Sequence, residues 1–168
     1  RVKLAFWRVS TYQVSAGKTF DDVPYPLLTA HIGNEQFAYT DLAYNTMNFY
    51  EFVSQSYASL NYQHKFGGFV FNRIPLMKKL KWRLVGTGNL LFGGVSDSTL
   101  GVQVRTDEVG DDLPFFNVLE SGRPFAEVGL GVENIFKFFR VDFIRRLTYL
   151  ENPGIDKTSI KISFSVSL

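Results

Sequence analysis

Hydrophobic and polar residues alternate without error over the last ten positions of the chain. One lysine and four serines separate the apolar residues Ile160, Ile162, Phe164, Val166 and Leu168. Successive side chains of a β-strand point to opposite faces, so the pattern predicts a strand with one apolar and one polar face. Its length matches the roughly 9–11 residues with which a tilted strand crosses a bilayer.

A less regular alternation predicts five further strands upstream. They cover residues 2–18, 50–66, 80–92, 125–134 and 138–150. The polar positions of the last two strands include charges of both signs, which suits a face on which charges pair. We expect the following residues to form one charge cluster in the lumen of a barrel: Glu127, Glu133, Arg140, Asp142 and Arg146.

The connections between these strands alternate in length. Short connections are predicted around 72–79 and 134–137, and long ones at 19–48 and 93–124, with an intermediate one at 151–157. Short turns on one side and long loops on the other are typical of outer-membrane barrels. We therefore expect an all-β fold, an antiparallel transmembrane β-barrel, with residues 1–168 as a single region.

Soluble and membrane barrels differ in the direction in which the apolar face of the sheet points. A soluble barrel points its apolar residues inward, whereas a membrane barrel points them outward and keeps a polar lumen. Here the polar face is rich in Ser, Gly, Asn, Gln and Thr, which favours a lumen, and Arg145 interrupts the apolar face. Aromatic residues at predicted strand ends suit the membrane interface: Phe66, Phe69, Phe71, Trp82, Phe136, Phe138, Phe139 and Tyr149.

Composition excludes several classes of protein. Lys plus Arg number 18 against 16 Asp plus Glu, so there is no basic excess for nucleic acid. The chain has no cysteine, which removes disulfides, thiolate nucleophiles and cysteine-ligated zinc. It starts at Arg1 with a strand-like segment and not with a signal peptide. We therefore expect a fragment that supplies about six strands of a larger barrel.

Candidate catalytic and metal-binding residues are few. His31 and His64 lack any metal-binding spacing, so we expect no metal, no cofactor and no enzymatic activity. Serines are plentiful without a nucleophile elbow, although a Ser–His pair that includes His64 would suit a small barrel enzyme acting on lipid. Acidic residues in the second long loop are interpreted as a solvated surface: Asp107, Glu108, Asp111, Asp112 and Glu120. The basic turn is interpreted in the same way: Arg73, Lys78, Lys79, Lys81 and Arg83.

Several stretches resemble a known family. They are residues 23–28, 48–83, 127–149 and the C-terminal strand, which together cover most of the chain. They resemble the end of a Bacteroidetes outer-membrane family that carries a carboxypeptidase-regulatory-like domain and has no established function. Its barrel is distantly similar to the bacterial surface antigen superfamily of BamA and TamA. Two departures are the final Leu168, where such barrels usually end in Phe, and the lack of periplasmic assembly domains.

The resemblance implies a location and a role. We expect a protein of the outer membrane of a Gram-negative bacterium that contacts membrane lipid and serves protein or lipid assembly or translocation. Other outer-membrane proteins or assembly factors are expected partners, and the C-terminal strand is expected to form one side of a seam in the barrel. The aromatic loop 19–48 is expected to fold over the lumen. The alternatives are a soluble β-barrel that binds an apolar ligand and a small barrel enzyme that acts on outer-membrane lipid.

Overall fold

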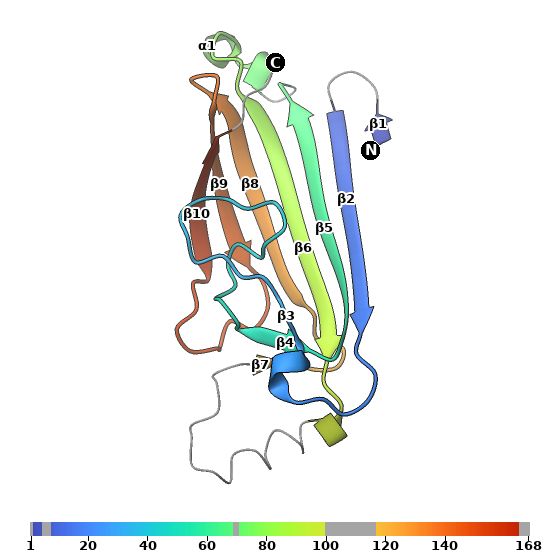
Figure 1. The fold of residues 1–168 in the computed structure, drawn as a ribbon. Helices are drawn as coiled ribbons and strands as arrows, with labels where there is room; N and C mark the ends of the chain where they lie inside the picture. The colour runs from blue at the N-terminus through green and yellow to red at the C-terminus, as the bar shows by residue number, and fades with distance from the viewer. Residues whose placement is uncertain (1, 5–7, 69–70, 100–116, 165–168) are drawn as a thin grey trace.

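The computed structural model describes residues 2–4, 8–68, 71–99 and 117–164, and it is dominated by one antiparallel sheet (Figure 1). The order of its strands is β1-β2-β5-β6-β8-β9-β10. Their bounds are β1 Val2–Leu4, β2 Arg8–Lys18, β5 Ser56–Gly67, β6 Arg83–Gly94, β8 Phe125–Ile135, β9 Phe139–Arg146 and β10 Thr158–Phe164. The prediction of an all-β, antiparallel fold with six long strands is confirmed.

The strands follow each other in the sheet as they do along the chain. Each of these seven strands pairs with its neighbours in chain order, because the elements between them belong to a separate small sheet. Within the described ranges β1 and β10 are edge strands and do not pair with each other, so the sheet is open and does not close into a barrel. No helix in these ranges is long and apolar enough to cross a membrane.

The connections differ at the two ends of the sheet (Figure 1). One end has the β8–β9 turn and a short segment with the 3-10 turn η2 (Phe71–Arg73) and the one-turn helix α1 (Pro75–Lys78). The other end has the long connections, which contain their own structure. They hold the 3-10 turn η1 (Tyr25–Leu27) and a three-stranded sheet of β3 (Thr29–Ala30), β4 (Phe52–Ser54) and β7 (Asn117–Val118).

Two predicted element bounds are wrong for identifiable reasons. The predicted strand 50–66 is interrupted at Gln55, so that β4 joins the small sheet and only β5 joins the large one. The predicted strand 138–150 ends at Arg146, and Tyr149 adopts a φ of 52°, which a strand does not allow. Alternation alone did not locate either point because the apolar spacing continues across it.

The register of the sheet shows which residues share each of its two faces. Leu60 pairs with Val14 on one side and Leu90 on the other, which places all three on the same face. The apolar face is exposed: Leu130 is 60%, Ile160 64% and Phe164 78% exposed. The polar face is buried instead, with Glu127 and Arg146 at 1% and Asp142 at 0%. The usual burial of a soluble sheet is therefore inverted.

The polar face is covered by the chain itself. Residues 31–51, which connect β3 to β4, lie across β8, β9 and β10 (Figure 1). Beside this loop, the small sheet and the long connections enclose an apolar core, which consists of Tyr44, Met47, Phe52, Leu91, Leu119, Phe125 and Tyr149. Tyr149 was expected among the aromatic residues of a membrane interface. It is 3% exposed, and its hydroxyl donates to the Arg123 carbonyl oxygen over 2.6 Å, so that expectation is wrong.

Candidate functional site: the loop docked on the polar face

The candidate site is the contact between the polar face and residues 31–51, which we call the docked loop. All five charged residues predicted as a cluster are buried on this face. They do not pair mainly with one another: two form an ion pair together, and the other three bind groups from elsewhere in the chain. The loop is therefore held by several separate contacts.

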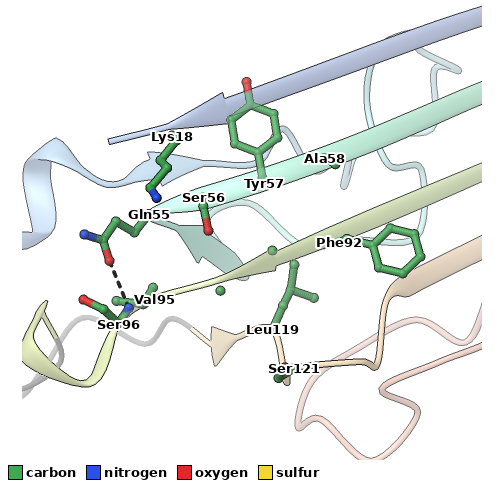
Figure 2. A pocket seen from close by; sticks show the side chains of 12 residues that line it. Lys18, Gln55, Ser56, Tyr57, Ala58, Phe92, Val95, Ser96, Leu119 and Ser121 are labelled. Atoms are coloured by element: carbon green, nitrogen blue, oxygen red, sulfur yellow. Dashed lines mark hydrogen bonds between the residues drawn. The ribbon is translucent and has the colours of Figure 1, made fainter. Parts of the chain in front are cut away.

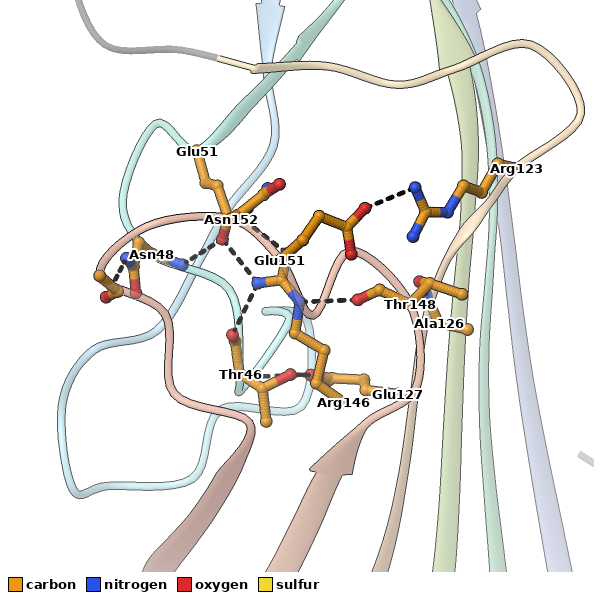
Figure 3. Close-up of polar contacts among 11 residues, drawn as sticks. Thr46, Asn48, Glu51, Arg123, Ala126, Glu127, Arg146, Thr148, Glu151 and Asn152 are labelled. Atoms are coloured by element: carbon orange, nitrogen blue, oxygen red, sulfur yellow. Dashed lines mark hydrogen bonds and ion pairs between the residues drawn. The ribbon is translucent and has the colours of Figure 1, made fainter.

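Arg146 and Glu51 form the most buried ion pair of the site (Figure 3). The guanidinium donates to both carboxylate oxygens, over 2.9 Å to Oε2 and 2.6 Å to Oε1. Its remaining donors bind the carbonyl oxygens of Thr46 and Thr148. Glu51 also accepts hydrogen bonds from the Asn152 side chain and the Asn48 backbone N–H. Arg146 thus joins β9 to the docked loop.

Glu127 holds the same loop from β8 (Figure 3). Its carboxylate accepts hydrogen bonds from the backbone N–H groups of Asn45 and Thr46, over 2.9 and 2.8 Å. It also accepts from the Thr46 hydroxyl over 2.6 Å and from the Asn89 side chain over 2.7 Å. A buried carboxylate with four donors is fully satisfied, which offsets the cost of removing its charge from water.

The other two acidic residues of the predicted cluster pair along the same face. Arg140 and Asp142 form a bidentate pair with both N–O distances at 2.7 Å, and the Arg140 guanidinium lies over the Tyr39 ring, 4.5 Å from its centroid. Burial raises the pKa of the Tyr39 hydroxyl to about 12, so this phenol stays neutral. Glu133 pairs with Lys65 over 3.0 Å. Opposite charges thus meet across β9, β8 and β5.

Lys161 connects the loop to the edge strand β10. Its ammonium donates to the Asn34 carbonyl oxygen over 2.7 Å and to the Gln36 carbonyl oxygen. Beside it, the N–H of Tyr39 donates to the carbonyl of Ile162 over 3.0 Å, and the N–H of Ile162 donates to the carbonyl of Phe37 over 2.9 Å. The loop therefore covers one position of the free edge of β10, as a short added strand would.

His31 fixes the start of the docked loop. Its Nε2 lies 2.9 Å from the Ser54 hydroxyl, and both side chains are buried. Burial lowers the pKa of the imidazole to about 4, so His31 is neutral at pH 7. His31 lies just after β3, and its burial had no signal in the sequence.

The C-terminal strand lies as the alternation predicts over the residues that the structure describes. Ile160, Ile162 and Phe164 point to the exposed apolar face, opposite Phe143, Val141 and Phe139 of β9. Val166 and Leu168 lie outside the described residues.

His64 lies on the apolar face. Its Nδ1 is 2.7 Å from the hydroxyl oxygen of Ser10. Within the described part of the chain, its other contacts are with the rings of Tyr62 and Phe66, and no carboxylate or amide orients the imidazole. The same part holds no group of three metal-ligating side chains.

Most of the acidic residues predicted in the long connection 93–124 cannot be placed. Asp107, Glu108, Asp111 and Asp112 lie outside the described residues. Glu120 is exposed, close to Arg123, which forms an ion pair of 2.6 Å with Glu151. That pairing lowers the pKa of the Glu151 carboxyl.

A separate open hollow of about 760 Å³ lies at the long-connection end of the sheet (Figure 2). Lys18, Tyr57 and Phe92 line it from the ends of β2, β5 and β6. Gln55 accepts a hydrogen bond from the Ser96 backbone N–H over 2.9 Å at its margin. It has one charged residue and no cluster of catalytic groups among the residues that line it.

Sequence reasoning missed three residues of the site: Glu51, Lys161 and His31. The alternation predicts a strand position for Glu51 and a polar position of the C-terminal strand for Lys161. Their partners are 95 residues away for Glu51 and 127 for Lys161, which no local pattern reveals.

These observations define an all-β protein with an open antiparallel sheet, a buried charged face that holds a loop, and an exposed apolar face. Residues 1–98, more than half of the chain, match the model of the family described as "Family of unknown function (DUF5686) C-terminal domain". The chain belongs to this family. No match was found among curated proteins or among solved structures.

Proposed function

We propose that the chain forms part of the wall of an outer-membrane β-barrel in a Gram-negative bacterium. The apolar face of the sheet contacts lipid, and the polar face with its docked loop faces the lumen. The inverted burial supports this most directly, because charged residues are enclosed while Leu130, Ile160 and Phe164 are exposed. A soluble apolar-ligand barrel would need the opposite arrangement.

The strand lengths and the connections give further support. β2, β5, β6 and β8 have 11 or 12 residues, enough for tilted strands to cross a bilayer of ordinary thickness. Short connections gather at one end and long ones at the other, as in barrels of this class (Figure 1). Because lipid cannot satisfy open edges, the two edges of the sheet require further strands.

We further propose a role in protein or lipid assembly or translocation at the outer membrane, with the free edge of β10 as one side of a seam. Two features support this role. The docked loop fills the polar face with satisfied hydrogen bonds, which suits a plugged lumen better than an open pore. Over the described residues of β10, the loop covers the free edge at Ile162 alone, which leaves the other backbone groups that point away from β9 available for a pairing strand.

Fractionation tests the membrane proposal. We expect the protein to remain in the outer membrane after carbonate and urea washes, to need detergent for extraction, and to migrate differently on gels before and after heating. Release by carbonate as a folded, water-soluble protein would contradict the proposal.

Conductance tests the position of the loop. Lys161→Met removes the ammonium that binds the Asn34 and Gln36 carbonyls while keeping side-chain volume, so we expect larger or more frequent openings in planar bilayers. Lys157→Met is the matched control, because Lys157 is exposed just before β10. Equal conductance in both variants would mean that the loop does not occlude a lumen.

Depletion in cells tests the assembly role. We expect lower amounts of folded outer-membrane proteins or of surface lipid when the protein is depleted, with partial rescue by a Lys161→Met variant and full rescue by Lys157→Met. Unchanged amounts of both would contradict an assembly role while leaving the membrane location intact.

The contact between Ser10 and His64 favours a second candidate, hydrolysis of membrane lipid. The imidazole would take the proton from the Ser10 hydroxyl as its oxygen attacks an ester carbonyl, and would then give it to the leaving alcohol. Water would then attack the acyl group on Ser10, which releases the fatty acid and restores the Ser10 hydroxyl. This candidate predicts ester hydrolysis that Ser10→Ala and His64→Gln abolish equally. Activity that survives both substitutions, or no activity in detergent-solubilised protein, would exclude it.

A further inference from the structure

The apolar face carries a groove of about 550 Å³ that crosses β5, β6, β8 and β9. It exists because β6 has glycine at two successive outward positions, Gly86 and Gly88. Gly88 lies between Tyr62 of β5 and Val128 of β8 in the register, and no heavy atom lies within 4 Å of a Cβ built on it. The neighbouring side chains therefore leave this space open.

The walls of the groove are mainly apolar. Phe66 lines it from β5, Leu130 from β8 and Phe143 from β9, with the imidazole of His64 at the β5 side. Such a lining accepts a hydrocarbon chain, and only a few polar groups are present to orient a ligand.

Arg145 provides a cation at one end of the groove. It pairs with Val128 in the β8–β9 ladder, so it shares the apolar face, and its side chain is exposed. It makes no hydrogen bond or ion pair with any residue that the structure describes. The carboxylates of the described strands of the large sheet, Glu127, Glu133 and Asp142, are buried on the opposite face. Among the described residues, no carboxylate lies within ion-pair distance of the Arg145 guanidinium.

We propose that this groove binds an anionic phospholipid, one whose headgroup carries no cation to offset the phosphate, with that phosphate on Arg145 and one acyl chain along the groove. The inference rests on the proposed contact of the apolar face with lipid. A guanidinium on such a face needs a counter-charge and hydrogen-bond acceptors, and an anionic lipid phosphate at headgroup level would supply both. Arginine suits this role because its planar donors match two phosphate oxygens at once.

The position of Arg145 along the strand agrees with this orientation of the lipid. It is the penultimate residue of β9, at the end with the long connections, and therefore near the headgroup level. From there the groove continues toward Phe66, which lies at the opposite end of β5 beside the short connection. A bound lipid would thus point its chain into the hydrocarbon region.

Quenching by brominated lipid tests the proposal. The chain has no cysteine, so Thr158→Cys, next to Arg145 in the β9–β10 ladder, places a single fluorophore beside the groove. The protein is folded into phosphatidylcholine vesicles that contain a small fraction of brominated phosphatidylglycerol or brominated phosphatidylcholine. We expect the anionic lipid to be preferred by about tenfold, the effect of one hydrogen-bonded charge pair.

Variants separate the charge from the groove. Arg145→Gln should remove the preference and Arg145→Lys should keep part of it. Gly88→Leu should weaken quenching by the anionic lipid because the new side chain would enter the space between Tyr62 and Val128, which both line the groove. Gly94→Leu is the matched control, since Gly94 lies on the same strand and face with open space around its Cβ, but neither Gly94 nor its ladder partner Ser56 lines the groove.

The outcomes distinguish this proposal from the membrane proposal. Quenching by both lipids without preference, or a preference that survives Arg145→Gln and Gly88→Leu, would overturn the lipid site while the apolar face still meets lipid. No quenching by either lipid would overturn both.

Discussion

The two faces of the large sheet have opposite relations to their surroundings. On the polar face, glycines permit close contact: a Cβ built on Gly131 would lie 2.2 Å from Asp142 Oδ1, and one on Gly93 would lie 2.3 Å from the Ser54 hydroxyl oxygen. On the apolar face, Gly88 and Gly94 have no atom within 4 Å of a built Cβ. The described residues therefore pack tightly against the charged face and leave the apolar face exposed.

This difference shows that the chain satisfies its polar groups internally. Every buried side-chain nitrogen or oxygen among the described residues has a hydrogen-bond partner. The side chains of the apolar face gain no comparable cover from the described residues, so shielding them from water requires a further contact. Lipid provides that cover in the proposed function.

The largest loss of stability is expected from breaking the Arg146–Glu51 ion pair on the polar face. Arg146→Met leaves Glu51 buried without its main partner and should destabilise the protein by about 3–5 kcal/mol. The double variant Arg146→Met with Glu51→Met should recover much of this loss, because no lone charge remains. Guanidinium unfolding in lipid vesicles measures both, and a double variant less stable than Arg146→Met would contradict the account.

A lysine placed on β2 should change the stability less than the loss of the ion pair does, but the change should differ between the two faces of the strand. Val14 is 74% exposed on the apolar face, and Gln13 beside it is exposed on the polar face. Val14→Lys should cost about 2–4 kcal/mol in lipid near the bilayer midplane, and Gln13→Lys should be nearly neutral. The same unfolding assay compares them. Equal stability would mean that the apolar face lies in water.

Acid should loosen the docked loop through His31. Its pKa falls from the ordinary 6.5 to about 4 on folding, so the unfolded state takes up a proton first as the pH decreases. The stabilisation is complete above pH 6.5 and is lost as the pH falls toward 4, by about 3 kcal/mol at most. His31→Asn should flatten this part of the pH dependence of unfolding, which a variant at exposed Lys157 should not change.

The smallest effect is expected from adding a methyl group to a glycine. Gly88→Ala should stabilise the protein by about 0.5–1 kcal/mol, because the strand becomes less flexible and the new group meets no atom. Gly131→Ala should destabilise it, since the Cβ would overlap the Asp142 carboxylate. Thermal unfolding of the two variants in the same vesicles measures the difference, and shifts of the same sign would contradict the packing described for the two faces.

The sequence predicted the strands well because alternation is a local property. Ile160, Ile162 and Phe164 are on one face of β10 as expected, and the residues of the predicted charge cluster lie together on the buried face. It did not predict the partners of these charges. The backbone of Glu51 lies just before β4, after a turn in which Tyr50 has a φ of 57°, and that turn brings Glu51 to Arg146. Such long-range contacts depend on the path of the loop, which has no periodic signal.

The contact of the apolar face with lipid is tested most directly by fluorophores on two neighbouring residues of β10. Ile160→Cys places one on the exposed apolar face, and Ser159→Cys places one on the opposite face. In folded protein in vesicles, we expect brominated lipid to quench the Ile160 probe strongly and the Ser159 probe weakly, while aqueous iodide fails to reach the Ile160 probe. Equal quenching of both probes by brominated lipid, or ready quenching of the Ile160 probe by iodide, would contradict it.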